Sequence, residues 1–301
     1  MRKKTMTFLL GCLVAVPMCA DETPLGGFYY GSMPAPTGWE WQSPDSVAYN
    51  KQQPHAWFFS FASVENARKV LPEHSEYWRS LDGEWRFHWS PNPDARPKDF
   101  MAANYDDSAW DKVQVPMNWN VAGLQQDGSQ KWGKPIYSNQ RVIFQHSVRP
   151  GDWKGGVMRE PNKDWLSYDH RNEVGSYRRT FTVPAEWKGR QVCINFDGVD
   201  SFFYLYVNGK YVGFSKNSRN LAQFDITPYL KEGENVVAAE VYRHSDGSFL
   251  ESQDMFRLPG IFRSVSLTAK PRVQVRDIVA IPDYDESFTD ASLKIRAYVS
   301  N

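Results

Sequence analysis

Residues 202–214 carry the local signal that most restricts the fold of this chain. They read Phe-Phe-Tyr-Leu-Tyr-Val-Asn-Gly-Lys-Tyr-Val-Gly-Phe, so two β-rich runs are separated by two residues. Asn208 and Gly209 accept the positive φ angles of a type I′ turn, whose twist matches that of paired antiparallel strands. The segment therefore predicts a β-hairpin.

The sequence around this hairpin predicts an all-β fold. From Glu84 onward, short alternating segments are separated by turn residues at the spacing of a β-sandwich. Glu232-Gly233-Glu234 is typical of a turn, and one short helix is predicted at Ser63–Val70. Further strands are predicted at Gly175–Val183, Gln191–Phe196, Asn235–Tyr242 and Phe262–Ala269.

The first 20 residues resemble a secretory signal peptide. Arg2, Lys3 and Lys4 precede an apolar stretch, and Ala20 is followed by polar residues. We expect a periplasmic or secreted protein, or a surface lipoprotein if Cys12 in Leu-Leu-Gly-Cys is lipidated. No later stretch is long and apolar enough to predict a transmembrane helix.

Charge and cysteine content exclude several classes of partner and fold. The chain has 35 basic and 35 acidic residues, so removal of the three basic residues of the signal leaves a net charge of −3. A nucleic-acid partner is therefore not favoured. Cys193 is the one cysteine after the signal, which excludes a disulfide framework and leaves a small buried residue or a reactive thiol as alternatives.

The chain divides into four predicted parts. Residues 1–20 are the signal, 21–75 form a Pro- and aromatic-rich arm, and 76–270 form the sandwich. Gln140–Arg171 is a long stretch without periodicity inside it. Residues 271–301 contain two predicted strands, which cannot bury a core alone, so we expect the N-terminal piece of a longer protein.

The run from His244 to Arg257 places three carboxylates, an amide and an arginine between two predicted strands. Such a loop, held at both ends by strands, is where binding residues usually lie. Asp254 could instead pair with Arg257 or Arg263, and Asp246 could simply form a turn with Gly247.

Several motifs resemble the N-terminal region of the glycoside hydrolase family 2 β-galactosidases, over about His55 to Asn301. The motifs are Ser80-Leu-Asp-Gly-Glu-Trp-Arg-Phe87, Val115-Pro-Met-Asn-Trp119, Pro135-Ile-Tyr-Ser-Asn139, Gly175-Ser-Tyr-Arg-Arg-Thr-Phe-Thr-Val-Pro184, Phe196-Asp-Gly-Val199 and Phe224-Asp-Ile-Thr227. Several of them are shared with β-glucuronidases and β-mannosidases, whereas the run Ser245–Arg263 resembles the β-galactosidase branch.

The resemblance implies a jelly-roll, galactose-binding-like sandwich and the beginning of an immunoglobulin-like sandwich near Pro271. The catalytic TIM barrel, which would carry both catalytic glutamates, is absent from this chain. By the same resemblance, Asn139 and Asp254 bind the sugar, Asp254 also binds sodium, and Asp246 binds magnesium. Asn139 could instead cap a turn. Trp119, Trp132 and Tyr137 are the rings expected nearest to the substrate.

Three functional hypotheses follow. The first is the binding and scaffold part of a retaining β-galactosidase acting on galactoside oligosaccharides or glycans, inactive without the barrel, with homo-oligomerisation left open. The second is a free-standing carbohydrate-binding module. The third is a family 2 β-glucuronidase or β-mannosidase.

Overall fold

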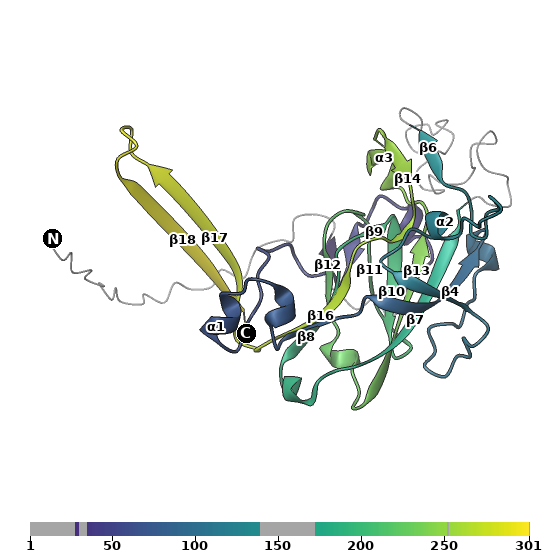
Figure 1. The fold of residues 1–301 in the computed structure, drawn as a ribbon, viewed down its shortest axis with the longest axis horizontal. Helices are drawn as coiled ribbons and strands as arrows, with labels where there is room; N and C mark the ends of the chain where they lie inside the picture. The colour runs from purple at the N-terminus through teal and green to yellow at the C-terminus, as the bar shows by residue number, and fades with distance from the viewer. Residues whose placement is uncertain (1–27, 30–34, 139–171, 252, 301) are drawn as a thin grey trace.

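The computed structural model describes residues 28–29, 35–138, 172–251 and 253–300, and two packed β-sheets dominate them (Figure 1). In this described part, the large sheet has eight strands in the order β1 (Phe28–Tyr29), β2 (Ala48–Tyr49), β11 (Lys210–Ser215), β10 (Phe202–Val207), β13 (Glu234–Tyr242), β7 (Val174–Thr182), β4 (Gly83–Ser90) and β5 (Asp111–Val115). The small sheet has four, in the order β12 (Ala222–Asp225), β8 (Gln191–Phe196), β16 (Val265–Lys270) and β3 (Trp78–Ser80). The predicted all-β, jelly-roll sandwich is confirmed.

The predicted hairpin at 202–214 is strands β10 and β11. Asn208 and Gly209 have φ angles of 51° and 80°, as the type I′ turn requires. Every residue of β10 is buried because both of its faces are covered. Phe203 and Leu205 point into the core between the sheets, whereas Phe202 and Tyr204 belong to a second cluster on the opposite face.

That second cluster fixes the N-terminal arm on the sandwich. Trp41 and Tyr49 of the arm pack in it with aromatic residues of β10 and β13. The Trp41 and Tyr242 rings stack with their centroids 5.3 Å apart. Because β2 also pairs with β11, part of the arm is a strand of the large sheet.

Other predicted elements agree with the structure with small shifts. β8 has the predicted bounds, and β7 and β13 begin one residue earlier than predicted. The expected strand Phe262–Ala269 begins later, as β16 (Val265–Lys270), and the preceding residues Gly260–Ile261 form a separate strand, β15, that pairs with β9 (Val199–Asp200). Helix α1 (Val64–Ala67) is shorter than its predicted range.

Four short elements gather at one end of the sandwich (Figure 1). They are α2 (Trp119–Ala122), α3 (Ser248–Glu251) and the antiparallel pair β6 (Ile136–Ser138) and β14 (Met255–Arg257). This end therefore holds most of the charged run recognised in the sequence.

Strands β17 (Gln274–Tyr284) and β18 (Ala291–Ser300) form a hairpin that extends from the sandwich (Figure 1). Apolar residues stay exposed along it, with Leu293 at 62% and Ile295 at 61%. An immunoglobulin-like continuation of this hairpin remains a prediction.

The signal, Asn139 and the stretch Gln140–Arg171 lie outside the described residues. Within the described residues, no helix has the length and hydropathy to cross a membrane.

Candidate functional site

The charged run begins where β13 leaves the large sheet. Arg243 and His244 follow that strand and are buried, and α3 then carries the chain outward to Asp254. β14 follows and pairs with β6, so strands hold the loop at both ends, as the sequence predicted.

Asp254 lies exposed at the tip of this loop beside two aromatic rings. Its carboxylate accepts a hydrogen bond from the Tyr137 hydroxyl, and this bond is the main reason that the pKa of Tyr137 is raised. Tyr137 and Phe256 are 55% and 59% exposed, with ring centroids 5.2 Å apart. The hydrogen bond described for Asp254 is thus to Tyr137, and a structural pairing with Arg257 or Arg263 remains an alternative.

The second predicted sugar ligand, Asn139, lies outside the described residues. Ser138, which precedes it in the sequence, pairs with Met255, which directly follows Asp254. The ladder between β6 and β14 thus joins the two motifs that carry the predicted sugar ligands, although 115 positions separate Asn139 from Asp254 in the sequence.

A buried ion pair supports the base of the loop. Arg243 Nη1 lies 2.9 Å from Glu173 Oε1, and both side chains are at most 1% exposed. Trp119 Nε1 donates to Glu173 Oε2 at 3.2 Å, and Arg243 Nη2 donates to the Lys134 carbonyl at 2.7 Å. This pair therefore ties the loop to the segments that precede β6 and β7.

A second polar cluster lies under α3. Glu251 accepts hydrogen bonds from Ser218 N at 2.8 Å and Ser218 Oγ at 2.5 Å. A cavity of about 20 Å³ between Asp200, Arg243 and Glu251 has room for about one water molecule. Burial raises the pKa of Asp200 to about 7, against the opposing effect of Arg219.

Asp246, the predicted magnesium ligand, is already paired with a cation. Its Oδ1 lies 2.8 Å from Lys216 Nζ, and the two side chains are 12% and 4% exposed. Phe249 N also donates to the Asp246 carbonyl at 3.1 Å, so Asp246 forms a turn as well.

The described residues contain no group of three or more His, Cys, Asp or Glu that could hold a metal ion. Magnesium does not fit Asp246 in this arrangement, because a dication would be placed beside a buried ammonium group.

Two of the three aromatic rings expected near the substrate are part of the core. Trp119 is fully buried and Trp132 is 8% exposed, and both pack near Phe87. The expectation was wrong for these two because both rings belong to the hydrophobic core of the sandwich, and Tyr137 alone of the three presents a ring to solvent. Cys193 is buried, and burial raises the pKa of its thiol to about 12, which favours the small buried residue over the reactive thiol.

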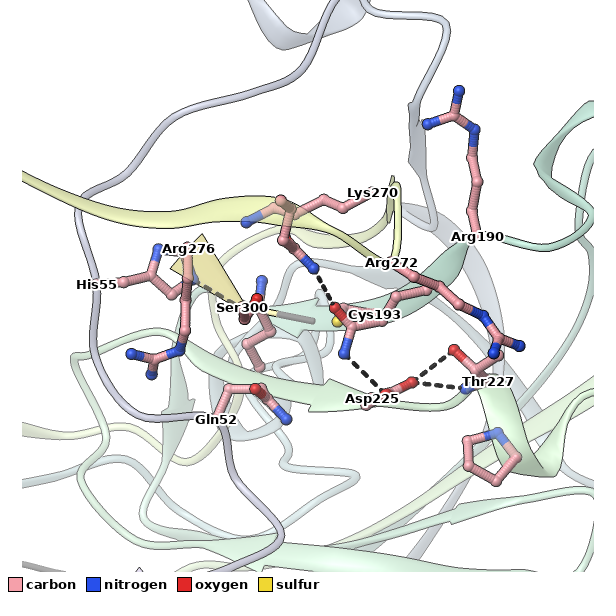
Figure 2. Close-up of a pocket in the computed structure, with 14 residues that line it drawn as sticks. Gln52, His55, Arg190, Cys193, Asp225, Thr227, Lys270, Arg272, Arg276 and Ser300 are labelled. Carbon is pink, nitrogen blue, oxygen red and sulfur yellow. Dashed lines mark hydrogen bonds between the residues drawn. The ribbon is translucent and has the colours of Figure 1, made fainter. Parts of the chain in front are cut away.

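A cavity of about 470 Å³ lies elsewhere, where β8, β12 and β17 meet (Figure 2). Four basic residues line it, namely Arg190, Lys270, Arg272 and Arg276. These cations do not converge on one point: Arg190 extends away from the other labelled side chains, and its guanidinium lies 3.9 Å from the Tyr77 ring centroid. The one acid that lines the cavity, Asp225, is bonded to Thr227 and Gln191. The cavity therefore lacks a focused binding geometry.

The exposed group at the loop tip combines the Asp254 carboxylate with the Tyr137 and Phe256 rings. A retaining glycosidase needs two carboxyl groups about 5 to 5.5 Å apart. Asp254 is bonded to a tyrosine hydroxyl, and Glu251 is bonded to Ser218. A carboxylate beside two exposed rings suits a ligand with hydroxyl groups and an apolar face.

Sequence reasoning missed Glu173, Lys216 and the contact between Tyr137 and Phe256. Glu173 and Arg243 are 70 positions apart, and Lys216 and Asp246 are 30 apart. No local pattern links such residues, because only sheet pairing brings them together.

Part of the chain matches a protein family. The family described as "Glycosyl hydrolases family 2, sugar binding domain" matches residues 162–271. A β-galactosidase of Priestia megaterium is 38% identical over 263 residues, which are 87% of this chain and 24% of that protein. A β-galactosidase of Psychromonas ingrahamii is 35% identical over 87% of this chain and 23% of its own length. The chain thus spans about a quarter of the length of these relatives.

Solved structures share the fold. A β-glycosidase from Bacteroides vulgatus superimposes with a TM-score of 0.50 at 22% identity, covering 74% of this chain and 24% of its own. A Bacteroides uniformis β-glucuronidase gives the same TM-score and identity, over 74% of this chain and 22% of its own. At this identity the likeness supports the fold alone.

Proposed function

Since the chain belongs to glycoside hydrolase family 2, we propose that it supplies the sugar-binding and scaffold part of a retaining β-galactosidase that removes terminal β-D-galactose residues. The observation that carries the proposal is the exposed group that Asp254, on the loop between β13 and β14, forms with Tyr137 of β6 and Phe256 of β14. The curated relatives at 35–38% identity are named β-galactosidases, which favours galactose over glucuronic acid or mannose.

The chemistry of this group suits a pyranose. The Asp254 carboxylate accepts hydrogen bonds from sugar hydroxyls, and Tyr137 and Phe256 offer apolar surface to the sugar's CH face. Asn139 is proposed to bind the sugar from the other side. The two catalytic carboxyl groups are proposed to belong to a barrel domain of the same polypeptide, which would complete the pocket.

The first test is galactoside binding and hydrolysis by the 301-residue chain. We expect no hydrolysis of a chromogenic β-galactoside and an affinity weaker than millimolar, because most pocket walls would come from the barrel. In NMR titrations with methyl β-galactoside, the perturbed resonances should be those of Tyr137 and Phe256, and Asp254→Asn should abolish the perturbation.

Asp283→Asn is the matched control, since Asp283 is an exposed acid on β17, far from this loop in sequence. Measurable hydrolysis by the chain would refute the assignment of catalysis to a barrel. Millimolar or tighter affinity would instead favour the free-standing binding module.

Sodium at Asp254 is proposed with the sugar. The exposed carboxylate and the Tyr137 hydroxyl oxygen provide oxygen ligands of the kind that hard cations take. Replacing sodium by a large organic cation should then weaken galactoside binding in the wild type and leave Asp254→Asn unchanged.

The proposed location is the periplasm or the cell exterior. It follows from the signal-like residues 1–20, and mass spectrometry of the protein from its native host tests it. A mature chain beginning at Asp21 supports export, a lipid-modified Cys12 supports the lipoprotein alternative, and an uncleaved Met1 in the cytoplasmic fraction contradicts both.

A further inference from the structure

The buried ammonium group of Lys216 lies at the junction between the N-terminal arm and the charged run from His244 to Arg257, here called the functional loop. Its Nζ lies 2.8 Å from Asp246 Oδ1 and donates to the Ser43 carbonyl at 2.5 Å. The Lys216 side chain is 4% exposed. One ammonium thus connects the arm, the end of β11 and the turn that precedes α3.

Backbone hydrogen bonds converge on the same junction. Asp246 N donates to the Trp41 carbonyl at 2.9 Å, and Lys216 N donates to the Val47 carbonyl at 3.0 Å. The arm is therefore bonded on both sides of Ser43, and α3 begins two residues after Asp246.

Nearby carboxylates favour the charged form of Lys216 at this junction. Burial lowers the pKa of Lys216, whereas Asp246, Glu40 and Asp45 act to raise it. Glu40 is also buried: burial alone would raise its pKa, but the hydrogen bonds from Tyr204 and Thr37 outweigh that effect and lower it. The Asp246 carboxylate and the Ser43 carbonyl oxygen thus lie beside the ammonium, and oxygen ligands of these kinds are also those that a hard metal ion takes.

We propose that the Lys216 ammonium is the resident cation of this junction, so that the arm and the functional loop are held together without a divalent metal. An octahedral Mg²⁺ would need several oxygen ligands at about 2.0–2.1 Å, and Lys216 occupies the space beside two of the available oxygens. This inference concerns the fold of the junction and does not depend on the proposed sugar.

Thermal unfolding of the 301-residue chain, followed by near-ultraviolet circular dichroism in excess EDTA and in excess MgCl₂, tests the proposal. The wild-type midpoint should be the same in both solutions. Lys216→Gln should lower the midpoint in EDTA by roughly 5–15 °C, because it leaves Asp246 buried and unpaired. MgCl₂ should restore part of that loss, since the glutamine carbonyl, Asp246 and the Ser43 carbonyl then offer oxygen ligands.

Two further variants control the result. Lys210→Gln removes an exposed lysine from the beginning of β11 and should change neither the midpoint nor its response to Mg²⁺. Lys216→Gln combined with Asp246→Asn should lose the rescue by Mg²⁺. A wild-type midpoint that falls in EDTA and returns with MgCl₂, with the response absent from Asp246→Asn, would overturn the proposal. That comparison needs no folded Lys216→Gln protein.

Discussion

At the scale of single residues, the functional loop depends on charges that the sandwich buries and pairs. Glu173 and Arg243 lie at the ends of β7 and β13, which are neighbours in the large sheet. Removing one partner of a buried pair leaves an uncompensated charge, which costs more than the pair itself contributes.

We therefore predict that Arg243→Met lowers the free energy of unfolding by about 3–5 kcal/mol, because Glu173 would stay buried without its partner. Lys112→Met is the control. It breaks the exposed pair between Lys112 and Glu84, whose side chains are 56% and 53% exposed, and should cost less than about 1 kcal/mol. Urea unfolding of both variants measures the two losses in free energy of unfolding. Equal losses would contradict the structural role of Arg243.

Asp200 provides a pH prediction at the same scale. Its pKa is raised by burial from 3.8 to about 7, so between these pH values the folded chain holds a proton that the unfolded chain has lost. This group's contribution to stability is therefore present at low pH and is lost as pH rises through about 7.

The Asp200→Asn variant cannot ionise here and should not lose this stability as the pH rises. Its free energy of unfolding, relative to that of the wild type, should therefore increase by up to about 4 kcal/mol between pH 4 and pH 7. Urea unfolding at a series of pH values measures the difference. Parallel curves for the two proteins would show that Asp200 ionises normally in the folded chain.

At the scale of elements, local sequence specified the turns, whereas packing against other elements specified which strand faces are buried. The turn at Asn208 and Gly209 is readable because few residues accept its positive φ angles. Burial of both faces of β10 depends on the small sheet on one side and the arm on the other.

The Gly209→Ala variant tests whether the turn between β10 and β11 stabilises the fold through its backbone conformation. At φ +80° an added Cβ meets no atom closer than 3.6 Å, so the cost should come from backbone conformation and amount to about 1–2 kcal/mol. Lys210→Ala, at the next and exposed position, should be nearly neutral. Chemical unfolding compares the two variants, and equal effects would argue against the turn as the cause.

At the scale of the whole molecule, the sandwich and the hairpin of β17 and β18 differ in how they are supported. The hairpin is bonded to the rest of the chain near its base: Asp277 accepts from Ala56 N at 2.8 Å, and Gln274 donates to Gln191 at 2.7 Å. An isolated two-stranded hairpin is marginally stable in water.

The rates of amide hydrogen exchange should therefore differ between the hairpin and the sandwich. Amides of β18 near Leu293 should exchange at least about a thousandfold faster than those of β13, since they can open without unfolding the sandwich. Mass spectrometry of exchanged peptides measures this. Equal protection would show that further contacts hold the hairpin.

The candidate site was only partly predictable. Asp254 stood out because a charged loop between strands is unusual, and the structure places it exposed beside Tyr137. The partner of Asp246 was not predictable, because Lys216 looks like an ordinary lysine after a strand until the hairpin and the arm bury it. The same limitation made Trp119 look like a substrate contact, although it lies in the core.

The sequence alone determined the fold class, the turn between β10 and β11, most strand positions and the loop that carries Asp254, because alternation and turn chemistry act between residues close in the chain. Tertiary structure alone decided which charges are paired, which rings are buried and which cation lies beside Asp246. These properties depend on burial and distance between residues tens of positions apart, and sheet pairing sets both.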